Sequence, residues 1–203
     1  RPGEPHHAEA ATSGRGGDGD DGVAQVHQAI LVNSQEAGMS VIDEVLRANQ
    51  EYVPRHSPIE LSPRPRRKLA VLTCMDTRLS AAALGLAVGD AHILRNAGGI
   101  ATEDALRSLL VSHHLLGAEE FMIVHHTDCG LMKRGEEEIR GRIVSRMGCE
   151  ASVPASFHTF TDLEESVRHQ MEAVRNHPWV PKEIPVRGFV YDVTTGGLRE
   201  VFR

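Results

Sequence analysis

The chain has few cysteines, no long apolar run and no excess of basic charge, and each shortage excludes a class of protein. Its 203 residues include only 3 cysteines, an odd number too small for a disulfide framework, so we expect reduced thiols and a cytoplasmic protein. The formal charge of -6 argues against a nucleic-acid-binding protein, which would present a basic surface. No apolar run approaches the roughly 18–20 residues that a membrane span requires, so we expect no membrane partner.

The first 38 residues differ in composition from the rest of the chain. Residues 1–22 are rich in glycine, aspartate, alanine and histidine, and a segment of this kind has too little apolar surface to fold. We therefore predict a disordered or weakly structured extension over residues 1–38 and a single domain over residues 39–203.

Short apolar runs alternate with amphipathic segments along residues 39–203. The runs predict strands over residues 69–74, 91–94, 121–124 and 186–191, and a last strand near 198–202 after a turn at 194–197. Helical spacing predicts helices over residues 39–52, 103–116 and 131–147, and one that opens with a capping box at Thr161–Glu164 and ends at Pro178. Strands separated by helices indicate an α/β fold: a mainly parallel central β-sheet flanked by helices, with an antiparallel C-terminal edge.

Two of these helices have an apolar stripe that must pack against another surface. The stripe of the helix over 39–52 must pack on its own sheet or on a neighbouring subunit; it consists of Val41, Ile42, Val45 and Leu46. In the helix over 131–147 we expect an inward stripe of Ile139, Ile143, Val144 and Met147, and a solvated face with Glu136, Glu137 and Glu138.

Two short motifs carry the side chains for a metal site: Cys74-Met75-Asp76-Thr77-Arg78 and His126-Thr127-Asp128-Cys129. Cys74 ends the first predicted strand and His126 follows the third, and the carboxyl ends of parallel strands meet at one edge of a sheet. Two thiolates and one imidazole suit Zn²⁺, and three protein ligands leave a fourth position open, as catalytic zinc sites do.

An acid–base pair accompanies the metal motif, because Asp76 and Arg78 follow Cys74 closely. If extended backbone continues as far as Arg78, the two-residue period places all three side chains on one side. Asp128 lies between two candidate ligands, and we expect it to support the turn instead of binding the metal. His125 is expected to point to the face opposite His126.

These motifs, together with Arg95-Asn96-Ala97-Gly98-Gly99 and His125-His126-Thr127-Asp128-Cys129-Gly130, resemble the hallmark stretches of the β-class carbonic anhydrases. The resemblance is to the small bacterial branch with the His-His-Thr-Asp-Cys-Gly string, and it extends from about Met39 to the C-terminus. It implies one zinc ion per chain and a homodimer or dimer-based tetramer with the active-site cleft at the subunit interface. It also implies roles for individual residues: Cys74, His126 and Cys129 as zinc ligands, Asp76 and Arg78 as the catalytic dyad, and Gly98 and Gly99 beside the substrate pocket.

The implied reaction is the reversible hydration of carbon dioxide to bicarbonate and a proton by attack of zinc-bound hydroxide. Asp76 is also a candidate fourth zinc ligand in a closed form of the site, which would make the activity pH-dependent. Two alternatives stay open at this point. One is a hydrolase of carbonyl sulfide or carbon disulfide on the same zinc scaffold, and the other is a non-catalytic zinc regulatory module.

Overall fold

The computed structural model describes residues 40–56, 62–152 and 154–202. The chain divides into two units, Arg1–Ile59 and Glu60–Arg203, and each is described by itself. The extension predicted over residues 1–38 lies outside the described residues. Within the described ranges, no helix combines the length and the apolar character needed to cross a lipid bilayer.

The described part of the first unit is helix α2 (Val41–Tyr52), followed by the short 3-10 helix η1 (Val53–Arg55). The predicted helix is confirmed, and it begins at Val41 because Ser40 and Asp43 form a capping box, each side chain accepting a hydrogen bond from the other's backbone N–H. None of its residues is buried. The apolar stripe is between 57% and 73% exposed at Val41, Ile42, Val45 and Leu46.

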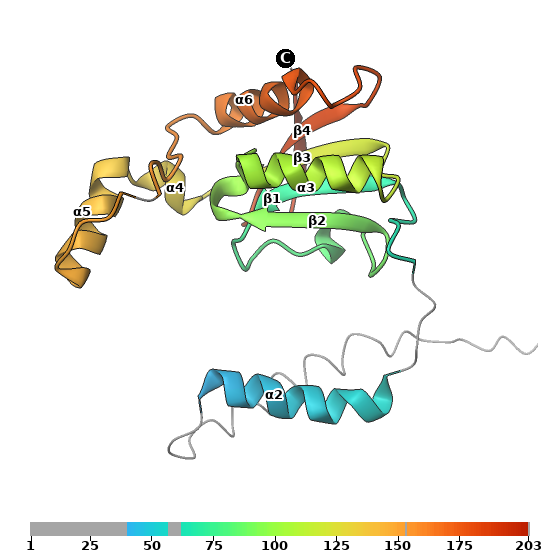
Figure 1. The fold of residues 1–203 in the computed structure, drawn as a ribbon, viewed down its shortest axis with the longest axis horizontal. Helices are drawn as coiled ribbons and strands as arrows, with labels where there is room; N and C mark the ends of the chain where they lie inside the picture. The colour runs from blue at the N-terminus through green and yellow to red at the C-terminus, as the bar shows by residue number, and fades with distance from the viewer. Residues whose placement is uncertain (1–39, 57–61, 153, 203) are drawn as a thin grey trace, which may run out of the picture. The chain divides into compact units, whose positions relative to one another are not determined.

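The second unit is built on a five-stranded sheet with the order β2-β1-β3-β4-β5 (Figure 1). Its strands are β1 (Leu69–Cys74), β2 (Ala91–Asn96), β3 (Glu120–His126), β4 (Val186–Tyr191) and β5 (Leu198–Val201). The first four strands are parallel, and β5 pairs antiparallel with β4. The predicted α/β fold, with its antiparallel C-terminal edge, is therefore confirmed. Strands β2 and β3 each continue further toward the carboxyl edge than the sequence predicted.

Helices α3 (Glu103–His114) and α6 (Leu163–Asn176) cover one face of this sheet (Figure 1). Their apolar residues and those of four strands form one buried cluster, which includes Leu72, Leu109, Phe121, Ile123, Val167, Met171, Val174, Val190 and Val201. Helix α6 comes very close to β4 because Gly188 has no side chain, and a Cβ there would overlap Met171 and Val167. The opposite face carries a second cluster, in which Val71 and Val124 pack against the loop that contains η2 (Ala82–Leu84).

The predicted helix over 131–147 is wrong as a single element, because the chain forms α4 (Gly130–Lys133) and α5 (Glu136–Met147). Arg134 has an extended backbone and Gly135 is the extended N-cap of α5, so the helical hydrogen bonding stops between them. The predicted inward stripe is also not buried. No residue of α5 is buried, and Ile143 and Met147 are 44% and 69% exposed.

Two details at the ends of α5 and α6 differ from prediction. Glu136 does not lie on a solvated face, because its carboxylate accepts hydrogen bonds from Phe157 N (2.8 Å) and Ser156 Oγ (2.7 Å). The capping box predicted at Thr161–Glu164 is not formed, because the helix begins one residue later with a simple N-cap. Asp162 is the N-cap of α6 and accepts from Glu165 N at 2.8 Å, since an aspartate caps a helix at least as well as a threonine.

Candidate metal centre

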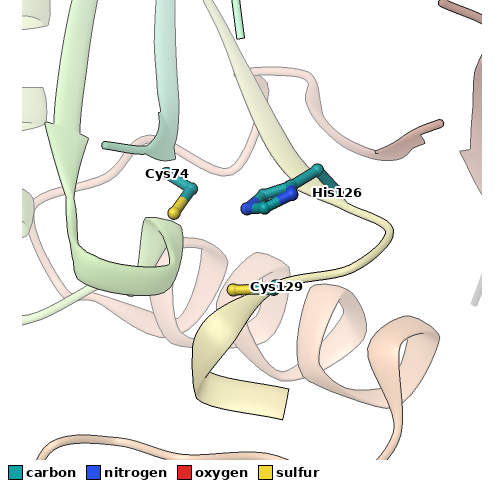
Figure 2. Close-up of side chains that lie close together, drawn as sticks. All are labelled: Cys74, His126 and Cys129. Carbon is teal, nitrogen blue, oxygen red and sulfur yellow. The ribbon is translucent and has the colours of Figure 1, made fainter. Parts of the chain in front are cut away.

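The three predicted metal ligands lie together at the carboxyl edge of the sheet (Figure 2). Cys74 is the last residue of β1 and His126 is the last residue of β3, and these two strands are parallel neighbours. Cys129 comes after a short turn and is the N-cap of α4. The two Sγ atoms and a ring nitrogen of His126 all lie within 4.8 Å of one another, and all three residues are buried.

The hydrogen bonding of His126 fits a metal ligand. Its Nδ1 lies 2.8 Å from the carbonyl oxygen of Thr127, which can only accept, so Nδ1 carries the proton in the neutral ring. The other nitrogen, Nε2, is then an unprotonated lone pair, and it is buried with no hydrogen-bond partner. Because buried polar atoms normally have partners, the free Nε2 beside two thiols is best explained by a metal ion that completes the site.

The electrostatics of the cluster also favour a cation. A hydrogen bond from Cys129 lowers the pKa of Cys74 to about 3, although burial opposes this shift. The same hydrogen bond and burial raise the pKa of Cys129. Burial lowers the pKa of His126, but the neighbouring Cys74, Thr127 and Asp76 together outweigh burial and raise it. Cys74 is thus an ionised thiol, and a divalent ion would bind two thiolates and a neutral imidazole once Cys129 and His126 have given up their protons.

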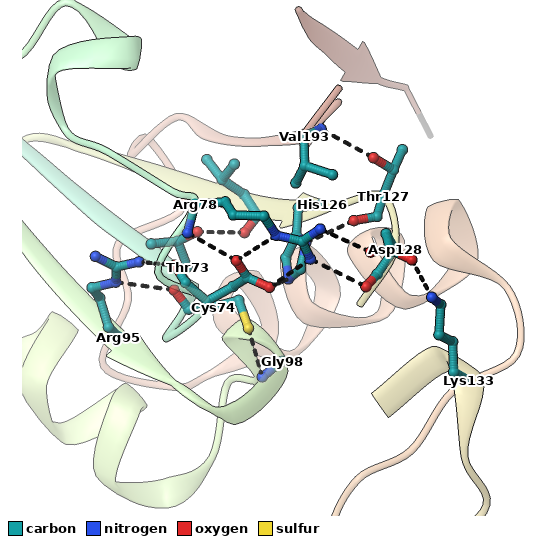
Figure 3. Close-up of polar contacts among 12 residues, drawn as sticks. Thr73, Cys74, Arg78, Arg95, Gly98, His126, Thr127, Asp128, Lys133 and Val193 are labelled. Atoms are coloured by element: carbon teal, nitrogen blue, oxygen red, sulfur yellow. Dashed lines mark hydrogen bonds and ion pairs between the residues drawn. The ribbon is translucent and has the colours of Figure 1, made fainter. Parts of the chain in front are cut away.

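Asp76 and Arg78 form a bidentate pair beside this cluster (Figure 3). Arg78 Nε donates to Asp76 Oδ1 at 2.9 Å, and Nη2 donates to Oδ2 at 2.8 Å. Extended backbone does not continue as far as Arg78, because the chain turns after β1. The backbone N–H of Arg78 bonds Asp76 Oδ1 (2.9 Å), so a turn brings the two side chains together. Arg78 holds the pKa of Asp76 well below its ordinary value, and Asp76 Oδ2 lies 3.8 Å from His126 Nε2.

Asp128 binds the same guanidinium from the other side. Arg78 Nη1 donates to Asp128 Oδ2 at 2.8 Å, while Lys133 forms an ion pair with the other carboxylate oxygen. Lys133 and Arg78 together lower the pKa of Asp128 to about 2. The sequence indicated that Asp128 supports the turn between two ligands, but its contact with Arg78 joins residues 50 positions apart and has no signal in the sequence.

The loop that contains η3 (Ala97–Gly99) closes over Cys74. Gly98 N donates to Cys74 Sγ at 3.4 Å, and Gly98 and Gly99 have φ values of +84° and +71°, which only glycine adopts without strain. A Cβ on Gly99 would stand 3.0 Å from the Thr73 carbonyl carbon, so the residue must lack a side chain. Both glycines therefore lie next to Cys74 and the end of β1.

Arg95 and His125 hold this loop and the end of β1 in place. Arg95 Nε donates to the carbonyl oxygen of Cys74 at 3.0 Å, and its Nη2 donates to that of Asp76. His125 is fully buried and, as expected, is not one of the clustered ligands; its Nε2 lies 3.2 Å from the carbonyl oxygen of Gly99. Both contacts of Arg95 are with backbone oxygens, which agrees with a structural role beside the Gly-Gly loop.

The chain matches the family model described as carbonic anhydrase over residues 69–198. It is 36% identical over 165 residues to β-carbonic anhydrase 1 of Mycobacterium tuberculosis, covering 80% of this chain and 99% of that protein. It is also 35% identical over 182 residues to the carbon disulfide hydrolase of Acidianus, covering 78% of this chain and 88% of that protein.

The fold is also similar to those of solved structures. The crystal structure of the carbonic anhydrase from Streptococcus mutans superposes with a TM-score of 0.76 at 44% sequence identity, covering 81% of this chain and 99% of that chain. The family match includes all three clustered ligands and the strands that carry them. With its buried Cys74–His126–Cys129 cluster, the chain belongs to the β-carbonic anhydrase family of zinc enzymes.

Proposed function

We propose that this chain catalyses the reversible hydration of carbon dioxide to bicarbonate and a proton at a zinc ion held by Cys74, His126 and Cys129. The observation that supports this most strongly is the combination of three protein ligands with an ionised carboxylate, Asp76, next to them. A structural zinc site is normally closed by four protein ligands and needs no neighbouring carboxylate. This difference argues against a regulatory zinc module.

The chain's own side chains then have separate roles. When bound, zinc lowers the pKa of water and supplies a nucleophile near neutral pH. Asp76 accepts a hydrogen bond from the nucleophile and so aims a lone pair at the carbon of the substrate. Arg78 keeps Asp76 ionised through the bidentate pair and holds both of its oxygens. The loop with Gly98 and Gly99 packs closely on the end of β1, and Gly98 donates its backbone N–H to Cys74 Sγ.

The same geometry supports a pH-dependent closed form. Asp76 Oδ2 is 3.8 Å from His126 Nε2, so a small movement of Asp76 away from Arg78 would bring its carboxylate to the fourth zinc position. We expect reversible loss of activity as the pH falls toward about 6.5. At lower pH the nucleophilic hydroxide would be protonated to water, and the Asp76 carboxylate would replace this water at the metal.

Carbon disulfide or carbonyl sulfide is the second candidate substrate. The similarity to carbon disulfide hydrolases at 35% identity supports it, and these molecules have the same linear shape as carbon dioxide. The match with β-carbonic anhydrase 1 covers more of the relative, 99% against 88%, so we place carbon dioxide first.

We also propose that the protein forms a homodimer or a dimer-based tetramer. The exposed apolar stripe of α2 supports this, because such a stripe normally packs on another surface. Residues 39–203 would then act as one functional domain, with α2 contributing to the assembly. A cytoplasmic location follows from the need to keep the Cys74 and Cys129 thiols reduced for metal binding.

The decisive experiment is stopped-flow carbon dioxide hydration at about pH 8.5 on protein of known zinc content. We expect turnover well above buffer, with loss in Asp76→Asn at unchanged zinc content. Parallel assays with carbon disulfide, read as sulfide release, separate the two substrates. If one zinc per chain is bound and neither substrate is turned over, the catalytic proposal is wrong and a regulatory zinc module is favoured.

A further inference from the structure

We propose that Asp128, with Lys133, is a positioning residue that fixes the Arg78 guanidinium and through it the Asp76 carboxylate against the metal centre. This inference rests on the proposed function, because it concerns the orientation of the residue that guides the nucleophile. Asp128 acts through Arg78 and touches neither the substrate nor the metal.

The pairing of Asp76 with Arg78 is local. Both residues lie in the turn after β1, and the contacts between them are a backbone N–H bond and two side-chain bonds within that turn. These contacts fix the two side chains relative to each other. They do not fix the pair relative to His126 and Cys129, which lie on a different segment.

Asp128 connects the two segments. It lies between the ligands His126 and Cys129, and its Oδ2 accepts from Arg78 Nη1 at 2.8 Å while its carbonyl oxygen accepts from Nη2 at 3.4 Å (Figure 3). The guanidinium is planar, so carboxylates bound on two of its edges determine its orientation. Through Arg78, the ligand-bearing turn therefore sets the position of Asp76.

Asp128 itself is held by Lys133 and by the turn in which it lies. Lys133, at the end of α4, pairs with Oδ1 and leaves Oδ2 facing Arg78. The residue has φ +63°, a left-handed conformation that aspartate and asparagine tolerate better than most residues. The preceding residue is also fixed, because Thr127 N donates to the carbonyl of Tyr191 (2.9 Å) and Val193 N donates to Thr127 Oγ1 (3.1 Å). The carboxylate thus has a defined place from which to bind Arg78.

Two substitutions separate the charge of Asp128 from its backbone conformation. Asp128→Asn keeps the left-handed preference and the shape but loses the charge, whereas Asp128→Gly relieves the backbone and removes the side chain. We expect both variants to bind one zinc and to lose about three- to tenfold in kcat/KM, a modest effect because Arg78 and Asp128 are 42% and 44% exposed. Lys133→Gln should show a smaller loss in the same direction. Arg142→Gln, which breaks an ion pair with Glu138 on α5, is the matched control and should have no effect.

The direct readout is the NMR signal of the Arg78 side chain in the zinc-loaded protein, assigned with Arg78→Lys. A guanidinium held by two carboxylates rotates slowly and gives separate signals for its terminal N–H groups, and we expect these signals to merge in Asp128→Asn and Asp128→Gly. If the Arg78 signals are unchanged in Asp128→Asn, the proposal is overturned. This test is sufficient even if Asp128→Gly does not fold. Lack of turnover in the unmodified protein counts against the proposed function, whereas the Arg78 signals test the positioning role separately.

Discussion

The carboxyl ends of β1 and β3 differ from the segment 136–149, although both are built from regular sequence patterns. At the strand ends, Cys74, His126 and Cys129 are buried, and their surroundings are held by hydrogen bonds from several elements. Segment 136–149 consists of α5 and the two residues after it, and no residue of α5 is buried. The strand ends are therefore buried, whereas α5 has no buried residue, and we refer to segment 136–149 as the open segment.

The difference shows what an apolar pattern can indicate. Strands β1 and β3 have neighbours on both sides, and helices and loops cover both faces, so their apolar residues are buried. Helix α6 connects β3 to β4 and must return across the sheet, which buries Val167, Met171 and Val174. Helix α5 lies in the same connection between β3 and β4, but its apolar stripe is not buried against any other described element. Periodicity identifies the apolar face of a helix but not what covers it.

Exchange of a cysteine in each region should give the largest contrast. Cys74→Ser should lose zinc and more than about 100-fold in carbon dioxide hydration, because loss of a ligand exceeds the roughly 10- to 100-fold cost of losing a supporting residue. Cys149→Ser, at the end of the open segment, is the control, because Cys149 is exposed. Zinc analysis and stopped-flow kinetics measure both. Equal zinc loss in the two variants would show that Cys149 also binds metal.

A matched pair of isoleucines tests the difference in burial. Ile123 in β3 is completely buried, so Ile123→Ala should lower the free energy of unfolding by about 2–5 kcal/mol. Ile143 in α5 is 44% exposed, so Ile143→Ala should change it by less than about 1 kcal/mol. Urea unfolding at several protein concentrations measures both values. A large, concentration-dependent loss in Ile143→Ala would instead identify α5 as a subunit interface.

Two glycines should respond to the same substitution with opposite signs. Gly99→Ala adds a Cβ at 3.0 Å from the Thr73 backbone in a residue with φ +71°, so it should lower the free energy of unfolding by about 2–4 kcal/mol. Gly141 lies inside α5 with nothing within 4 Å of the added Cβ, so Gly141→Ala should raise it by about 0.5–1 kcal/mol. Chemical unfolding is the measurement. A stabilising Gly99→Ala would contradict the close approach of η3 to β1.

The smallest effect is expected at Glu136, because its charged carboxylate connects the open segment to the backbone of Phe157. Backbone hydrogen bonds from Phe157 lower the pKa of Glu136 from 4.5 to about 2, so ionised Glu136 stabilises the fold above about pH 4.5 and this contribution is lost toward pH 2. Glu136→Gln should therefore lower Tm by about 2–4 °C at neutral pH, and the difference from the unmodified protein should shrink between pH 4.5 and 2. Glu137→Gln is the neighbouring control. A difference in Tm that does not depend on pH would show that the charge is unimportant.

The sequence by itself determined the α/β fold and the identity of the metal-binding residues. Strand β1 was predicted at its observed bounds because a short continuous apolar run between polar segments is typical of a strand that is buried on both faces. Parallel strands deliver their carboxyl ends to one edge, so Cys74 and His126 were expected to meet there, as they do. These features depend on local patterns and on a topological rule, and both can be read along the chain.

Only the tertiary structure decided how the residues around the ligands are connected. The contacts of Arg78 with Asp128, of Arg95 with the carbonyl of Cys74, and of Glu136 with the backbone near Phe157 each join distant positions through charge or hydrogen bonding. Such contacts leave no periodicity in the sequence. The break between α4 and α5 was also missed, although Gly135 lies in a stretch without apolar residues between Met132 and Ile139. Local patterns determine which residues can form elements and bind a metal, and long-range packing decides which polar partners then hold them in place.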